Sequence, residues 1–117
     1  MKLYGIPNCS TVKKARTWLE QHAIAYEFHD FKKLGLDSTT GHAWLTQQPW
    51  EKLLNRSGMT WRNLSDSEKN AVVDAASALA LMQEKTSVIK RPVLVDNDRI
   101  LALGFNETEY ANLFAKE

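Results

Sequence analysis

The first 31 residues constrain the fold most, because they predict a strand, a helix and a second strand in immediate succession. Met1 to Ile6 is a short apolar run that ends in turn residues, and from Ser10 to Gln21 the apolar side chains recur with a helical period. Residues 25–31 then alternate aromatic and polar side chains, which is typical of a strand. Such a sequence predicts a βαβ unit, and its crossover is expected to be right-handed.

The single cysteine, Cys9, lies where the first strand gives way to this helix. A thiol at a helix N-terminus meets unpaired backbone N–H groups and the positive end of the helix dipole. Lys13 and Lys14 add positive charge close to the start of the helix. These surroundings favour the reactive thiolate, so we expect Cys9 to have a lowered pKa. The alternative is a small buried apolar residue, which is how most lone cysteines behave.

Composition and charge exclude several classes of protein. The chain has 117 residues, with the 44% hydrophobic and 25% charged content of an ordinary globular domain. A formal net charge of +1 gives no electrostatic footprint for nucleic acid or an anionic membrane. No apolar run approaches the roughly 20 residues that span a bilayer, and the first residues lack the regions of a signal peptide. With one cysteine and no internal disulfide, we expect a cytoplasmic protein without nucleic-acid or membrane partners.

The middle of the chain predicts helices. Apolar spacing favours one helix over residues 38–48 and another over 50–55, with Pro49 before the second. Ser65 and Glu68 have the spacing of a capping box, so we expect one long helix to follow it. That helix is predicted over residues 69–83.

The last third of the chain returns to strands. Residues 92–95 and 99–103 predict a hairpin with a three-residue loop at residues 96–98. Asn106 and Glu109 have the spacing of a cap on a final helix over residues 107–115. The complete order is therefore β-α-β, a helical insert, then β-β-α.

This order, with a thiol at the start of the first helix, resembles the arsenate reductase (ArsC) family, and within it the small YffB-like branch. The matching segments follow one another along nearly the whole chain, at residues 4–9, 13–16, 28–30, 50–55, 60–62, 74–77, 89–92 and 103–105. The same superfamily includes the Spx-type transcription regulators, which bind RNA polymerase.

The resemblance implies a thioredoxin-like (glutaredoxin-like) α/β fold. Its mixed four-stranded sheet would be formed by residues 1–6, 25–31, 92–96 and 99–103. We expect a single ArsC-like domain over residues 1–117. Residues 1–34 and 89–117 would form the thioredoxin-like core, and residues 35–88 an all-helical insertion.

The resemblance also implies a catalytic pair, in which Arg91 lies near the thiolate of a nucleophilic Cys9. The peptide bond that follows Arg91 would be cis, since it precedes Pro92. Arginine suits this place independently of any family, because it keeps its charge and its fork binds a carboxylate, phosphate or arsenate at two points. A surface arginine beside an edge proline is the alternative.

The expected substrate contacts are Lys13, Arg62 and Pro92. The resemblance implies a second arginine after a glycine-centred stretch of the insert, and Arg62 follows Gly58 in this way. Arg56 competes for that role, and either arginine could instead be a solvated charge.

Two positions depart from related chemistries. Where arsenate-reducing members carry a further arginine after the last strand, this chain has Gly104 and Phe105, so the oxyanion site is short of one positive charge. A low-molecular-weight phosphatase loop needs a cysteine and an arginine six positions apart, and here Ala15 stands in that place. Arg16 is then expected to be a surface helix residue.

Metal binding is not expected. The three histidines show no paired ligand spacing with the cysteine, and they are His22, His29 and His42. His29 is interpreted as a residue on a strand face.

The residue three positions after Cys9 is Val12, so the chain lacks a Cys-x-x-Cys pair. An oxidised Cys9 needs an external thiol, and glutathione is the obvious small one in a cytosol. We therefore expect a glutathione-dependent thiol/disulfide reductase that acts as a monomer on a small anionic or mixed-disulfide substrate. Glutathione would be its co-substrate, with no bound cofactor, and glutaredoxin is a candidate partner.

Two alternatives stay open. One is a glutaredoxin-coupled arsenate reductase, which uses the same nucleophile. The other is an Spx-like regulator that docks onto RNA polymerase, although Spx-type proteins often carry the Cys pair that this chain lacks.

Overall fold

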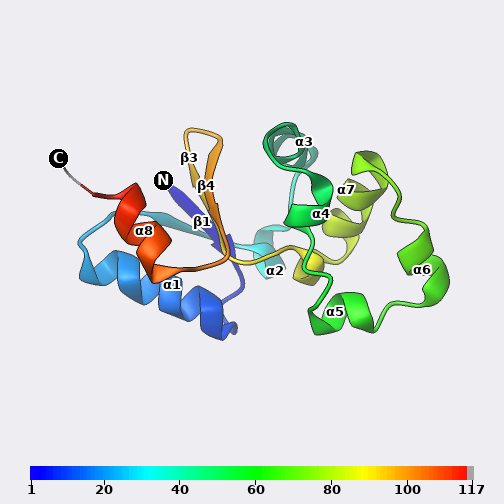
Figure 1. Ribbon diagram of the computed structural model, residues 1–117, viewed down its shortest axis with the longest axis horizontal. Helices are drawn as coiled ribbons and strands as arrows, with labels where there is room; N and C mark the ends of the chain where they lie inside the picture. Colours follow the sequence, from blue (N-terminus) through cyan, green and yellow to red (C-terminus); the bar gives the residue numbers. More distant parts are fainter. Residues whose placement is uncertain (116–117) are drawn as a thin grey trace. The chain divides into compact units, whose positions relative to one another are not determined.

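The computed structural model describes residues 1–115, so the last two residues of the predicted domain lie outside the described part. The chain divides into two compact units (Figure 1). The first contains residues 1–34 and the chain from residue 91 onward, and the second contains residues 35–90. That the two units form a single domain stays a prediction.

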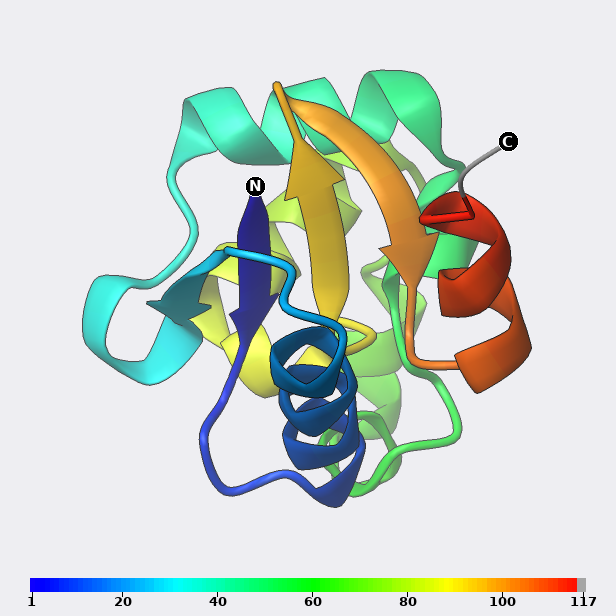
Figure 2. The same ribbon diagram turned by 90° about the vertical axis from the view of Figure 1, so that its left-hand side faces the viewer.

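The first unit is built on a mixed four-stranded sheet, as predicted. Its strands are β1 (Lys2–Gly5), β2 (Glu27–Asp30), β3 (Val93–Asp96) and β4 (Arg99–Leu103). They lie in the order β2-β1-β3-β4 (Figure 2). β1 pairs parallel to β2 and antiparallel to β3, and β3 pairs antiparallel to β4. An N-terminal βαβ unit completed by a C-terminal hairpin and helix is the predicted thioredoxin-like topology.

Three strands are shorter than predicted, and the first of them, β1, covers Lys2–Gly5 rather than residues 1–6. β2 ends at Asp30, because the Asp30 carboxylate accepts a hydrogen bond from the backbone N–H of Lys32 (2.9 Å) and so caps a short helix, α2 (Phe31–Leu34). β3 begins at Val93, since Pro92 has no N–H to donate to the ladder.

The loop between β3 and β4 has two residues, so the predicted three-residue loop is wrong. Asp96 pairs with Arg99 across the hairpin, which leaves Asn97 and Asp98 to make the turn. Both turn residues have positive φ, 49° and 65°. A two-residue turn of this kind needs positive φ at both positions, and Asn and Asp tolerate it better than other side-chain-bearing residues.

The core of the first unit lies between one face of the sheet and two helices, α1 (Ser10–Gln21) and α8 (Glu107–Leu113). Its buried side chains come from both helices and from β1, β3 and β4, and they are Leu3, Ala15, Trp18, Leu19, Leu94, Ala102 and Tyr110. α1 has its predicted bounds. α8 ends at Leu113 rather than Ala115, and Asn106 caps it as predicted by accepting from the N–H of Glu109 (2.9 Å).

The second unit is helical. It contains α3 (Ser38–Gln47), α4 (Trp50–Leu53), α5 (Met59–Arg62), α6 (Asp66–Asn70), α7 (Ala75–Glu84) and a 3-10 turn, η1 (Thr86–Val88). α3 and α4 shorten the two helices predicted there, and α5 and η1 were not predicted. The side-chain amide of Gln83 ties α7 to the start of α3, since it donates to the Leu36 carbonyl (3.2 Å) and to Ser38 Oγ (3.1 Å).

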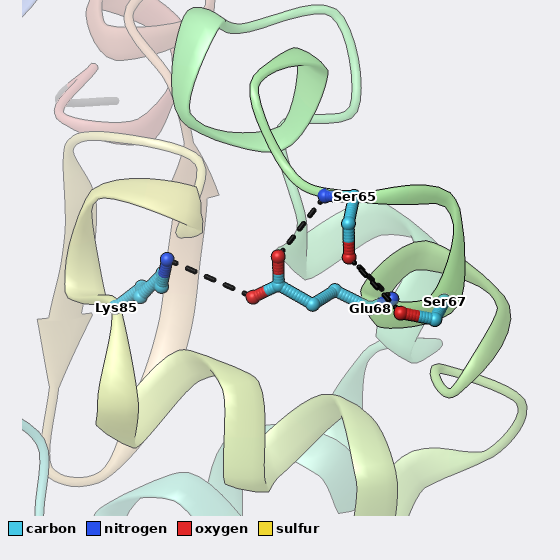
Figure 3. Close-up of polar contacts among 4 residues, drawn as sticks. All are labelled: Ser65, Ser67, Glu68 and Lys85. Atoms are coloured by element: carbon cyan, nitrogen blue, oxygen red, sulfur yellow. Dashed lines mark hydrogen bonds and ion pairs between the residues drawn. The ribbon is translucent and has the colours of Figure 1, made fainter.

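The capping box at Ser65 is present as predicted (Figure 3). Ser65 Oγ accepts from the N–H of Glu68 (3.1 Å), and a Glu68 carboxylate oxygen accepts from the N–H of Ser65 (3.0 Å). The second Glu68 oxygen lies 3.8 Å from the Lys85 ammonium. Lys85 follows α7, so this contact joins the start of α6 to the end of α7.

The single long helix predicted over residues 69–83 is wrong. α6 ends at Asn70 and α7 begins at Ala75. Asp74 starts the new helix, because its carboxylate accepts from the N–H of Ser77 (2.8 Å) while Ser77 Oγ accepts from the N–H of Asp74 (3.1 Å). This second capping box outweighs the alanine-rich helical propensity of the segment, which could not by itself fix where the helix began.

Candidate functional site

Cys9 lies at the N-cap of α1, directly after the loop that follows β1. Its backbone is extended, and its carbonyl accepts the first helical hydrogen bond, from the N–H of Lys13 (2.9 Å). Val12, in the first turn, is fully buried. A Cβ on Gly5 would lie 2.8 Å from a Val12 methyl carbon, so glycine at the end of β1 lets the first turn of α1 approach the sheet. This close approach holds Cys9 at the edge of the core.

The surroundings of the half-buried Cys9 thiol lower its pKa below the usual range. Partial burial acts the other way and raises the pKa. It is outweighed by hydrogen bonding from the backbone N–H of Val12, by the hydrogen bond and the positive charge of the Arg91 side chain, and by the backbone N–H of Thr11. Cys9 therefore stands at the N-cap without a side-chain capping hydrogen bond, and the N–H groups of the first turn and the Arg91 guanidinium act on the charge of its sulfur.

Arg91 reaches Cys9 from two residues before the start of β3. Its Nε is buried. The peptide bond between Arg91 and Pro92 is cis, as the resemblance implies. Pro92 is buried, and its carbonyl accepts from the N–H of Gly104 (2.8 Å), which ties the start of β3 to the end of β4. The structure thus brings Arg91 to Cys9, and Pro92 follows Arg91 directly in the chain. Substrate contact by Pro92 stays a prediction.

The other two predicted site residues are exposed. Lys13 lies on the first turn of α1, and Arg62 is the last residue of α5, in the second unit. The carbonyl of Arg62 accepts from the Lys69 ammonium (3.3 Å). Its competitor Arg56 lies with its guanidinium carbon 5.8 Å from the centre of the Trp50 ring. Substrate contact by Lys13 or Arg62 stays a prediction.

Arg16 is not the surface residue predicted. It is half-buried, with its guanidinium carbon 4.1 Å above the ring of Phe28, and its Nε donates to the Tyr26 hydroxyl (3.2 Å). The Tyr26 hydroxyl in turn donates to Glu20 (2.8 Å). Arg16 therefore packs α1 against β2. The alternating aromatic residues of this strand could have predicted the contact, because a cation on the covering helix has an aromatic face to stack on.

His29 packs among aromatic rings in the first unit, in keeping with its interpretation as a residue on a strand face. Its ring centre lies 4.5 Å from that of Tyr4 and 5.7 Å from that of Phe31. Within residues 1–115, no three His, Cys, Asp or Glu side chains are grouped as a metal ion would require. In the same residues, every helix is too short or too polar to cross a bilayer.

Comparison with known proteins gives a consistent family assignment. The model of the ArsC family matches residues 4–113. A solved YffB protein is 45% identical, with 97% of this chain and 98% of that chain covered and a TM-score of 0.90. An arsenate reductase (ArsC) related protein from Brucella melitensis is 49% identical over 97% of this chain and 92% of that one, with a TM-score of 0.76. The global transcriptional regulator Spx of Enterococcus faecalis is 26% identical over 100% of this chain and 88% of its own length.

Proposed function

The chain belongs to the ArsC family, and from that premise we propose that it is a glutathione-dependent thiol/disulfide reductase with Cys9 as its nucleophile. One observation carries the proposal. The Arg91 guanidinium hydrogen-bonds to Cys9, at a helix start whose N–H groups also face the sulfur, and together they lower the pKa of the thiol. A structural cysteine needs no such cation, whereas a nucleophilic cysteine reacts as its thiolate.

The reaction runs in two exchanges at the Cys9 sulfur. First, the Cys9 thiolate attacks the glutathione sulfur of a mixed disulfide between glutathione and a substrate thiol. A bond forms between Cys9 and glutathione, and the original S–S bond breaks and releases the substrate as a thiolate, which takes up a proton. Second, the thiolate of another glutathione attacks the glutathione sulfur on Cys9, which yields glutathione disulfide and frees the Cys9 thiolate.

In sum, the substrate disulfide gains two electrons and glutathione supplies them. A second protein thiol is not needed, in agreement with Val12 standing where a Cys-x-x-Cys protein has its resolving cysteine. Arg91 would hold Cys9 as the thiolate before each attack and when it leaves glutathione. Its charge makes Cys9 a good leaving group for the same reason that it lowers the pKa.

Arsenate is a less favoured substrate of the same nucleophile. Arg91 could bind an oxyanion at two points. The position after the last strand, where the resemblance implies a further arginine, is instead Phe105, whose ring centre lies 4.8 Å from that of Tyr110. An apolar ring packed in this way offers no charge to an oxyanion such as arsenate, so the site favours a disulfide over arsenate.

A regulator that docks onto RNA polymerase is the second candidate function. The observation that favours it is the Spx relative, which matches this chain from end to end. Docking does not need a nucleophilic thiolate, so the two functions differ in their dependence on Cys9.

One set of assays separates these functions. Purified protein is given glutathione with either a glutathione mixed disulfide or arsenate plus glutaredoxin, and glutathione disulfide is followed through glutathione reductase and NADPH. We expect turnover of the mixed disulfide that is lost in Cys9→Ser, and little or no turnover of arsenate. The reductase proposal fails if the wild-type protein turns over neither substrate. Capture of RNA polymerase by both the wild-type and the Cys9→Ser protein would favour the regulator.

A further inference from the structure

A groove runs along α1 and begins at Thr11, two residues after Cys9. It is lined by side chains of α1 between Thr11 and Gln21 and, opposite them, by Phe105, Asn106 and Glu107. Its volume is about 750 Å³. This is within the range of about 300–1,000 Å³ that is typical of small-molecule sites, and all of its lining residues belong to the first unit.

The lining of the groove begins two residues after the reactive cysteine. Thr11 lines the groove, and the backbone N–H of Thr11 is one of the groups that lower the pKa of the Cys9 thiol. The ten steps from Thr11 to Gln21 rise about 15 Å along the helix axis. An extended tripeptide spans about 10 Å. A molecule of that size can therefore place a thiol at Cys9 and still lie along the groove.

The charges of the groove specify what fits it. Lys13 and Lys14 both line it and are exposed, and neither forms an ion pair within residues 1–115. Glu107 is the one acidic side chain among the lining residues. The side-chain carbonyl of Asn106 is held by the N–H of Glu109, so the amide nitrogen of Asn106 remains as a donor. The groove thus pairs best with two anionic groups and one cation.

The wall opposite α1 is partly apolar and rigid. Phe105 is half-buried, with its ring set edge-on against Tyr110 at 4.8 Å between centres, and Tyr110 is fully buried. Methylene groups of a bound molecule can pack on this ring while its charged ends stay in water.

We propose that this groove binds the thiol co-substrate and selects an anionic thiol peptide of the size of glutathione. The two carboxylates pair with Lys13 and Lys14, the ammonium pairs with Glu107, and the methylene groups pack on Phe105. The inference rests on the reductase function proposed above. It adds the place where the second thiol binds and the charges that select it over neutral thiols.

Binding is tested with S-methylglutathione, which has the charges of glutathione but no reactive thiol. In an NMR titration of the wild-type protein, we expect the largest shifts at residues 11–21 and 105–107. Lys14→Glu should weaken binding about five- to tenfold, since it replaces an attractive charge with a repulsive one. The control is Lys33→Glu, the same change at an exposed lysine of α2 that does not line the groove, and it should leave binding unchanged. Shifts centred elsewhere, no binding, or equal effects of the two variants would overturn the proposal.

A kinetic comparison separates the groove from the reaction. Turnover of a mixed disulfide is measured with glutathione and with 2-mercaptoethanol, which is neutral. Lys14→Glu should lower the ratio of the glutathione rate to the mercaptoethanol rate about five- to tenfold at limiting thiol, since any effect of Lys14 on the Cys9 thiolate is shared by the two reactions. If neither thiol supports turnover while S-methylglutathione still binds along α1, the reductase function fails and the groove stands. If both thiols react and Lys14→Glu leaves the ratio of their rates unchanged, the groove proposal fails and the reductase function stands.

Discussion

The start of α1 and the starts of α6 and α7 satisfy the same backbone groups with different atoms. Every helix leaves its first N–H groups without helical partners. In α6 and α7, the side chains of Ser65 and Asp74 accept hydrogen bonds from residues three positions ahead. In α1, the N–H groups of the first turn act on the sulfur of Cys9. The Arg91 side chain does so as well, although Arg91 follows the whole helical unit in the sequence.

This difference separates a stabilising cap from a reactive one. The oxygen caps are exposed and their partners are local, so their bonds serve the helix that they begin. Sulfur is a weak hydrogen-bond acceptor, so Cys9 contributes less to the stability of α1. The N–H groups and Arg91 act instead on the charge of the sulfur, since they favour the thiolate that can attack a disulfide. Partial burial and a cation that acts on the capping atom itself distinguish the reactive helix start from the stabilising ones.

Cys9→Ser turns the start of α1 into an oxygen cap and should have the largest effect on function. We expect turnover of a mixed disulfide to fall to background, because a serine hydroxyl is not a thiolate at neutral pH. Stability should be retained or rise by up to about 1 kcal/mol, since serine is among the preferred N-cap residues. Urea unfolding measures the stability of the variant, and the coupled assay measures its turnover. A variant that is inactive because it is unfolded would contradict the comparison of the two kinds of cap.

Arg91→Ala removes the cation that acts on the capping atom of α1 itself. The pKa of Cys9 should rise, so at a pH below it the thiolate fraction falls about tenfold for each unit of the rise. The rate of iodoacetamide alkylation, followed across pH, measures this directly. Arg99→Ala is the matched control, because Arg99 is an exposed arginine at the start of β4, and it should leave the alkylation midpoint unchanged. A midpoint that is indifferent to Arg91 would make Cys9 a structural residue.

Local patterns predicted the elements of the first unit well, because each carried its own signal. The change from strand to helix around Cys9 gave α1 its bounds, and the alternating aromatics placed β2. The hairpin loop was missed by one residue, because the sequence does not show that Asp96 still pairs with Arg99. That pairing is decided by the twist of the hairpin and the positive φ of the two turn residues.

The second unit was predicted less well, and the reason is competition between signals. The alanine-rich stretch favours helix throughout, but Asp74 and Ser77 form a capping box inside it and divide it into two helices. The environment of Cys9 shows a different limit. The basic helix start was visible in the sequence, whereas contact with Arg91 could be reached only through the family resemblance, since no local pattern connects the two residues.

Ser65→Ala tests the stabilising kind of cap. It removes the hydroxyl that accepts from the N–H of Glu68, and we expect the free energy of unfolding to fall by about 1 kcal/mol. Ser67→Ala is the comparison. Within residues 1–115, the Ser67 hydroxyl contacts only the Ser65 hydroxyl (3.1 Å) and caps no backbone N–H, so its loss should cost less than the loss of the Ser65 hydroxyl (Figure 3). Both variants should leave the alkylation midpoint of Cys9 unchanged. A shifted midpoint in Ser65→Ala would contradict the view that oxygen caps act only locally.

Asp74→Asn should have the smallest effect. It should change the free energy of unfolding slightly, and only at pH values at which the Asp74 carboxyl is ionised. The N–H and the hydroxyl of Ser77 hydrogen-bond to the Asp74 carboxylate and lower its pKa, against a smaller opposing effect of burial. Because the folded pKa lies below the unfolded one, the stabilisation is complete above the unfolded value of about 3.9 and is lost as the pH falls through the folded pKa. Asparagine still caps α7 but carries no charge, so the wild-type protein should be slightly more stable than the variant at pH 6. Urea unfolding at a series of pH values should show this difference closing below about pH 3.9, and a difference that stays constant would mean that the charge of the cap contributes nothing.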